Sequence, residues 1–305
     1  QVSNTITCDK IDPVFFMSFL KDNQKRVSYA ASFGSSCVKE EDKEIISTLL
    51  KKYSTVSIRE NSGIKIAESL GVKATQVLDP TFLLSKDEWS RLLPKRECKE
   101  KFVLVYQLHP NKQFDKYAKA FAKSKGLKLY RISHCFHHIV RSGKFICCPP
   151  IEEFMWYIKN AEYFLTDSFH GTAFSIGFNT QFVNVLPKKY SERIQSILEL
   201  IGYENRILQS YDDFNITDEK IDFKKVNEKI DALRSITKSI KGSVILKGQY
   251  DYIFNQGKVK INRTGNAGMT AGGTGDALAG ICLSLLSQGL GPFDAAILAP
   301  YFNGK

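Results

Sequence analysis

Apolar runs alternate with amphipathic stretches along most of the chain, and this alternation predicts strands separated by helices. Short apolar runs predict strands at residues 26–31, 56–58, 75–78, 101–106, 127–132, 163–166 and 182–185. Apolar residues at helical spacing predict helices at residues 42–53, 60–70, 114–125, 151–160 and 191–201, with a further helix opening at 172–177. Strands separated by helices of about 10–12 residues are typical of parallel sheets with helices on both faces. The pattern therefore predicts an α/β protein.

Two changes along the chain divide it into three units. A polar stretch near residues 93–101 separates two sets of alternating strands and helices. Near residues 241–242 the composition shifts: residues 242–305 hold 12 of the 20 glycines but only five Lys and Arg and three Asp and Glu, against 38 and 29 in residues 1–241. We therefore predict a Rossmann-like unit over 1–95, a second Rossmann-like unit over 96–241, and a distinct glycine-rich unit over 242–305.

The composition narrows the class of protein. With 43% hydrophobic and 12% aromatic residues the chain can build cores, so it is not disordered or fibrous. No apolar run of about 18 residues predicts a transmembrane helix, and residues 1–20 lack the pattern of a signal peptide. Seven cysteines, an odd number in a long chain, favour free thiols in a reducing cytosol.

The formal net charge of +11 favours anionic partners, although scattered lysines also fit an ordinary solvated surface. A nucleic-acid partner is not expected, because basic and aromatic residues are not interleaved and no reader motif is present.

The stretch at 163–176 (YFLTDSFHGTAFSI) predicts a strand, a polar turn and the start of a helix. This order places Ser168, His170 and free N–H groups of residues 171–173 at a helix N-terminus, where unpaired donors and the helix dipole attract anions. A histidine titrates near neutral pH and can move a proton. A histidine that only caps the helix would show the same pattern.

A second basic group lies at another strand-to-helix turn. Arg59 follows the strand at 56–58, and its planar fork suits a carboxylate or phosphate, although a surface ion pair would have the same pattern. Lys188, Lys189 and Arg193 follow the strand at 182–185 and could supply further positive charge, or could be solvated surface residues.

Several stretches, in order from about residue 1 to 238, resemble the polysaccharide pyruvyltransferases: YAASFG (29–34), SIRENS (57–62), VLDPTFLL (77–84), PIEEFMWYIKNAEYFLTDSFHG (150–171) and the segment around Arg193. The resemblance implies transfer of pyruvate from phosphoenolpyruvate to a sugar of a cell-surface polysaccharide as a ketal. It also implies a fold like the two-domain B-type glycosyltransferases. Its first unit is expected to be incomplete here, because the chain starts just inside a Gly-Ser-Asp-x-x-Trp segment of the family.

The resemblance also implies roles for individual residues. His170 is the acid/base candidate, Arg59 an anion clamp, and Ser168, Lys188 and Lys189 are substrate-binding candidates. Many family members carry Arg-Leu-His where this chain has Ser-Phe-His at 168–170, so an arginine of that motif is absent. The implied partners are phosphoenolpyruvate as donor and a glycan as acceptor, with no separate cofactor, in the cytoplasm near the inner membrane face.

The glycine-rich unit carries a different chemistry. A loop rich in glycine leads into an apolar helix predicted at 277–286, an arrangement that can cradle phosphate with backbone N–H groups. Together with VILKG (244–248), VKIN (259–262) and GLGPFDAA (289–296), it resembles the ADP-dependent NAD(P)H-hydrate dehydratases of the ribokinase-like fold. The resemblance implies a partial ribokinase-like unit that uses ADP, with Asp276 as acid/base and an anion hole formed by Gly272, Gly273, Thr274 and Gly275.

One cluster of metal-ligating residue types remains, His134 to His138 with Cys147 and Cys148. Its spacing matches no closed zinc pattern, so no metal site is predicted. The alternative is a substrate-facing loop in which His137 or His138 touches an anion. Three functions stay open: the pyruvyltransferase, the dehydratase (a lyase), and a non-catalytic remnant that binds a sugar or an anion.

Overall fold

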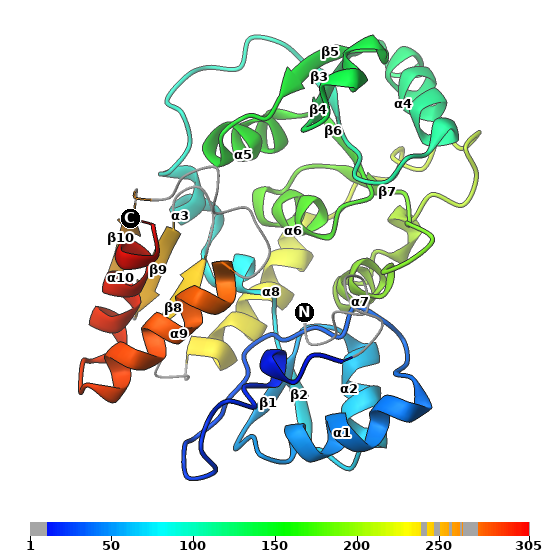
Figure 1. The fold of residues 1–305 in the computed structure, drawn as a ribbon. Helices are drawn as coiled ribbons and strands as arrows, with labels where there is room; N and C mark the ends of the chain where they lie inside the picture. The colour runs from blue at the N-terminus through cyan, green and yellow to red at the C-terminus, as the bar shows by residue number, and fades with distance from the viewer. Residues whose placement is uncertain are drawn as a thin grey trace.

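The computed structural model describes residues 11–238, 243–246, 251–255, 258–262, 264 and 274–304 (Figure 1). The described part contains three β-sheets. A two-stranded sheet pairs β1 with β2 in parallel, and a five-stranded parallel sheet has the order β5-β4-β3-β6-β7. The third sheet, β10-β9-β8, is antiparallel. The predicted α/β class with parallel sheets is confirmed.

The first sheet consists of β1 (Val56–Ile58) and β2 (Ala74–Gln76), with α1 (Glu40–Leu50) and α2 (Asn61–Ser69) packed around it. The strand predicted at 26–31 is wrong, because this segment forms only two isolated bridges to β1 and its preceding residue. Ala30 has a φ of 51°, which breaks the extended backbone there.

The five-stranded sheet is buried on both faces, as a parallel sheet requires. In β3, Leu104 faces one apolar core whereas Val103 and Val105 face the other, because successive side chains of a strand point to opposite faces. The strands are β3 (Phe102–Tyr106), β4 (Lys128–Ser133), β5 (Lys144–Cys147), β6 (Tyr163–Thr166) and β7 (Phe182–Asn184). The helices are α4 (Lys112–Ser124), α5 (Ile151–Asn160), α6 (Phe169–Phe178) and α7 (Glu192–Ile201).

The segments that follow the two-stranded sheet pack onto the five-stranded sheet, in the apolar core that contains Leu104. Phe82 in the 3₁₀ helix Pro80–Leu83 and Trp89 in α3 (Lys86–Ser90) are both 2% exposed and share an apolar cluster with β3, β6 and α6. Helix α8 (Phe223–Lys238) closes this region, since Arg234 Nε donates to the carbonyl of Phe82 at 2.8 Å. The unit boundary predicted after residue 95 stays a prediction.

The C-terminal elements form a small layer of their own. Strands β8 (Val244–Leu246), β9 (Asp251–Asn255) and β10 (Lys258–Asn262) are followed by α9 (Thr274–Ser287) and α10 (Pro292–Asn303). Helix α10 packs against α9 and β9, and α9 confirms the apolar helix predicted at 277–286. None of the described helices combines the length and the apolar character that a membrane span requires.

Candidate functional site

The turn between β6 and α6 is built by a serine cap. Ser168 is the N-cap of α6, is 4% exposed, and its Oγ accepts a hydrogen bond from Gly171 N at 3.2 Å. The N–H of Thr172 donates to Ser168 O at 3.0 Å. The prediction of free N–H groups at residues 171 and 172 is therefore wrong, because the cap and the first helical turn already pair them. Whether Ser168 binds substrate stays a prediction.

Arg59 and Asp79 form a buried ion pair at the carboxyl ends of the first sheet. Arg59 follows β1 and Asp79 follows β2, and Arg59 Nη1 lies 2.6 Å from Asp79 Oδ2. Asp79 is only 3% exposed, and its Oδ1 accepts hydrogen bonds from the backbone N–H and the hydroxyl of Thr81. Burial alone would raise the pKa of Asp79, but the charges of His170 and Arg59 and the bonds from Thr81 outweigh it and lower that pKa.

His170 lies beside this ion pair, although it comes from the other sheet unit. Its side chain reaches solvent, yet the protein crowded around the ring disfavours the charged imidazolium and lowers the pKa of His170 below 6.5. Asp79 opposes this effect, whereas Arg59 and Arg193 reinforce it. His170 is therefore neutral near neutral pH and ready to accept a proton when a negative charge arrives.

Phe169 brings a second arginine into the cluster. The guanidinium of Arg59 lies 5.3 Å from the centre of the Phe169 ring, and that of Arg193 from α7 lies 5.7 Å from it. The pKa of Arg193 is lowered by burial and by the like charge of Arg59. Helix α7 is held in place by Ser196, whose Oγ is 3.0 Å from Asn61 N. In Figure 1, α6 and α7 lie between the two parallel sheets.

The cluster contains buried polar atoms that the described protein atoms do not satisfy. Arg59 Nε, Arg193 Nε and Glu60 Oε2 all lack a hydrogen-bond partner among the described residues. The other oxygen of Glu60 accepts from the backbone N–H groups of Phe33 and Gly34, at 2.7 and 3.2 Å. Buried polar groups are nearly always paired in folded proteins, so these three atoms are available to bond water or a bound polar molecule.

Acidic groups offset the charge of the two guanidiniums, Arg59 and Arg193. Asp79 and Glu60 are buried beside them, and Glu192 also acts on Arg193. Protonation of His170 adds positive charge to the site, so that binding of an anion and protonation of His170 favour each other.

Arg59 and His170 are thus brought together, and Arg193, noted in the sequence only as a further charge, joins them. Asp79 and Glu60 were not predicted as site residues, although Asp79 directly follows the strand predicted at 75–78 and Glu60 directly follows Arg59. Lys188 and Lys189 are exposed on the turn between β7 and α7, and their roles stay predictions.

Most of the anion hole predicted in the glycine-rich unit lies outside the described residues. Gly272 and Gly273 lie outside the described residues, as does the side chain of Asp276, while Thr274 and Gly275 begin α9. The roles of these residues stay predictions.

The predicted cluster of His134 to Cys148 begins at the carboxyl end of β4, continues through the 3₁₀ helix Phe136–Val140, and ends with β5 and Cys148. His138 Nδ1 lies 2.7 Å from Ser133 Oγ, and Cys135, Cys147 and Cys148 are free thiols. Across the described part of the chain, no three His, Cys, Asp or Glu residues are grouped so that they could hold a metal ion.

Fold and site together define an α/β protein that gathers two arginines and a histidine between its two parallel sheets. A family model described as polysaccharide pyruvyl transferase matches residues 9–190, more than half of the chain, and the chain belongs to this family. A second model, described as NAD(P)H-hydrate dehydratase, matches residues 214–305, so one chain joins segments of both kinds.

The curated relatives are NAD(P)H-hydrate repair enzymes and a dehydratase. The bifunctional NAD(P)H-hydrate repair enzyme of Methanothermobacter thermautotrophicus is 48% identical over 82 residues, which are 27% of this chain and 16% of that enzyme. The ADP-dependent (S)-NAD(P)H-hydrate dehydratase of Cenarchaeum symbiosum is 39% identical over 62 residues, 20% of this chain and 22% of the relative. The chain thus spans about a sixth to a fifth of the length of these relatives.

Among solved structures, Os79 from O. sativa in complex with UDP is 12% identical and covers 61% of this chain and 50% of its own, with a TM-score of 0.38. A ribokinase-like superfamily protein from Enterococcus faecalis is 17% identical over 72% of this chain and 85% of its own, with a TM-score of 0.24. Likeness at this level does not bear on function.

Proposed function

We propose that this chain transfers pyruvate from phosphoenolpyruvate to two hydroxyls of a cell-surface glycan, forming a ketal and releasing phosphate. The observation that supports this best is the meeting of Arg59, Arg193 and His170 around Phe169. Phosphoenolpyruvate carries a carboxylate and a phosphate, and each can accept a pair of hydrogen bonds from one guanidinium. The unsatisfied Nε atoms of both arginines are donors of the required kind.

His170 is the proposed proton carrier. Ketal formation begins with protonation of the methylene carbon of phosphoenolpyruvate, which needs an imidazolium close to that carbon. The low pKa of His170 in the free protein means that the anionic substrate itself must promote its protonation. The proton is therefore present chiefly when there is a substrate to receive it.

The remaining predicted residues have supporting roles in this proposal. Ser168 fixes the turn that presents His170, because its hydroxyl caps α6. Lys188 and Lys189, exposed on the turn that precedes α7, would attract the phosphate. A glycan acceptor of this class would place the reaction in the cytoplasm at the inner membrane face, which cell fractionation tests.

The test is binding and turnover by the whole chain. Calorimetry should detect phosphoenolpyruvate binding, and a phosphate assay with a panel of glycans should detect release in the wild type but about 10²–10⁴-fold less in His170→Gln. His134→Gln removes an exposed imidazole on the loop after β4 and serves as the matched control. Equal rates in the wild type and His170→Gln contradict the assignment, and binding without any phosphate release supports the non-catalytic alternative.

A second candidate is an ADP-dependent NAD(P)H-hydrate dehydratase. It is favoured by the family model over residues 214–305 and by the 48% identity of an archaeal repair enzyme over 82 residues. In this proposal ADP binds at the loop of Gly272, Gly273, Thr274 and Gly275, with Asp276 as acid/base. Calorimetric titration with ADP up to about millimolar concentration tests it, and no detectable binding would exclude this function.

A further inference from the structure

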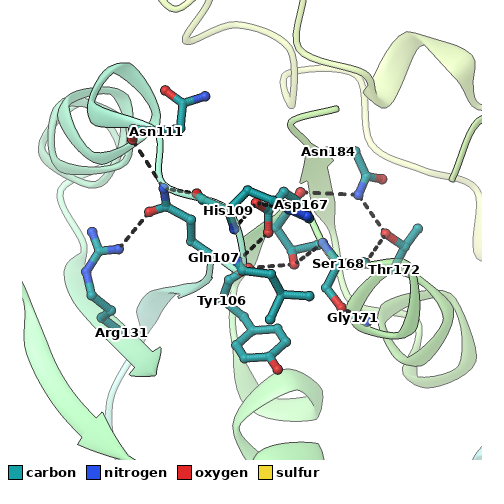
Figure 2. Close-up of polar contacts among 12 residues, drawn as sticks. Tyr106, Gln107, His109, Asn111, Arg131, Asp167, Ser168, Gly171, Thr172 and Asn184 are labelled. Atoms are coloured by element: carbon teal, nitrogen blue, oxygen red, sulfur yellow. Dashed lines mark hydrogen bonds and ion pairs between the residues drawn. The ribbon is translucent and has the colours of Figure 1, made fainter. Parts of the chain in front are cut away.

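A second histidine is held by a buried carboxylate at the carboxyl edge of the five-stranded sheet. Asp167 directly follows β6 and is 4% exposed. Its Oδ1 accepts a hydrogen bond from Leu108 N at 2.7 Å, and its Oδ2 accepts one from His109 N at 2.9 Å. The same Oδ2 lies 3.0 Å from Nδ1 of the His109 ring (Figure 2).

This contact fixes which nitrogen of His109 carries the proton. An ionised carboxylate can only accept hydrogen bonds, so Nδ1 of His109 must be the donor to Asp167 Oδ2. In the neutral ring the lone pair is then on Nε2. The side chain of His109 is 49% exposed, so that a molecule from solvent can reach the ring. The pair has the composition of a base oriented by a buried acid.

The loop that carries His109 is fixed on both sides. Gln107, 5% exposed, donates its side-chain amide to the carbonyl of His109 at 2.8 Å and to that of Asn111 at 3.2 Å. Asn111 in turn caps α4 through Gln113 N and Phe114 N. Figure 2 shows the Gln107 side chain bonded to this loop, with Asp167 bonded to His109 from the β6 side. An imidazole on such a support keeps one orientation, as a catalytic group requires.

The His109 and Asp167 pair is tied to the site already described through one turn. Strands β3 and β6 are parallel neighbours, and His109 and His170 follow their carboxyl ends. Asp167 stands three residues before His170, with the helix cap Ser168 between them. The β6–α6 turn therefore orients His109 through Asp167 and presents His170 on its helix.

The proposed reaction requires both a proton donor and a proton acceptor. Phosphoenolpyruvate and a diol give a pyruvate ketal and hydrogen phosphate. The methylene carbon gains one proton, the phosphate leaves with the electron pair of its C–O bond and gains another, and the two attacking hydroxyls lose one proton each. The protons balance, but they are taken up and given away at different atoms. A single imidazole that must be protonated for the first step is not free to accept the hydroxyl proton in the same step.

We propose that His109, oriented by Asp167, is the base that removes the proton from an attacking hydroxyl of the glycan acceptor. The inference rests on the proposed pyruvyl transfer. It places the glycan acceptor, a sugar with paired hydroxyls, at the carboxyl ends of β3 and β6. Asp167 acts as a positioning residue, through His109.

The test compares His109→Gln with the matched control His134→Gln, in the whole chain. His109→Gln should lower kcat for phosphate release in the presence of glycan by about 10²–10⁴-fold while the Kd of phosphoenolpyruvate changes less than about threefold. The limb of the pH–kcat profile that reports a proton acceptor should disappear. The titratable groups nearest to His109 are Asp167 and Tyr106. Beyond Gln107 lie three further charged groups, Arg131, Arg141 and Asp115.

A second measurement tests the geometry without turnover. Nitrogen NMR of the His109 ring should show the proton on Nδ1 in the wild type, and a mixture of tautomers in Asp167→Asn. A proton on Nε2 in the wild type overturns the proposal, as does an unchanged kcat in His109→Gln when the wild type is active. A wild type that neither binds phosphoenolpyruvate nor releases phosphate overturns the proposed function itself, and with it the reaction assigned to His109.

Discussion

Replacing Arg193 by glutamine separates the proposed anion-binding role from a structural one. Arg193 stacks on Phe169, and its Nε has no hydrogen-bond acceptor among the described residues. The substitution therefore removes a donor pair for the substrate while breaking few bonds in the free protein. This makes it a sharper probe than Arg59, whose loss would leave the buried carboxylate of Asp79 unpaired.

The expected magnitudes differ for binding and stability. Hydrogen bonds to charged groups contribute about 1.5–3 kcal/mol, so the Kd of phosphoenolpyruvate should weaken about 10–150-fold. Loss of the stacking contact costs about 0.5–1 kcal/mol of folding stability, and relief of the repulsion from Arg59 offsets part of it. The free energy of unfolding should therefore change by less than about 1 kcal/mol.

Calorimetric titration with phosphoenolpyruvate and urea unfolding of the same samples give both numbers. Lys119→Gln, which removes one exposed positive charge from α4 beside the five-stranded sheet, is the matched control and should change neither. An Arg193→Gln protein that binds phosphoenolpyruvate as tightly as Lys119→Gln would refute the reasoning.

Two further predictions concern pH and the helix cap. Anion binding should raise the low pKa of His170, so the added affinity for phosphoenolpyruvate is fully present below the free-protein pKa and is lost as pH rises through the bound-state pKa. The ratio of the two Kd values, His170→Gln to wild type, is measured from about pH 5 to 8, because the titration of the ligand itself cancels in this ratio. A ratio that stays constant with pH would contradict this prediction. Ser168→Ala should lower the free energy of unfolding by about 0.5–2 kcal/mol in urea, because Gly171 N loses its acceptor; no change would show that the cap is not stabilising.

The spacing of apolar residues was sufficient to predict an element where a segment follows a single pattern, that of a strand or that of a helix. Strand β6 and helix α5 have the bounds that the sequence predicts, because β6 is a short apolar run and α5 has apolar residues at helical spacing after Pro149 and Pro150. It failed at 26–31, where the left-handed backbone of Ala30 interrupts an otherwise suitable strand sequence. Helix α8 was missed within a charged run, although Val226 and Ile230 are buried at helical spacing.

The candidate site could be predicted only in part. Arg59 and His170 were identifiable because each stands at a strand-to-helix turn. The ion pair with Asp79 and the place of Arg193 beside Phe169 depend on how β2 and α7 pack, which no local pattern encodes. The same holds for His109 and Asp167, which are 58 residues apart and meet only because β3 and β6 are neighbours.

A crystal structure of the whole chain with phosphoenolpyruvate tests the central claim most directly. We expect the ligand beside Phe169, with its carboxylate and phosphate oxygens about 3 Å from the guanidinium nitrogens of Arg59 and Arg193 and its methylene carbon facing the His170 ring. Ligand density elsewhere on the chain, with these three side chains making no contact to it, would contradict the account.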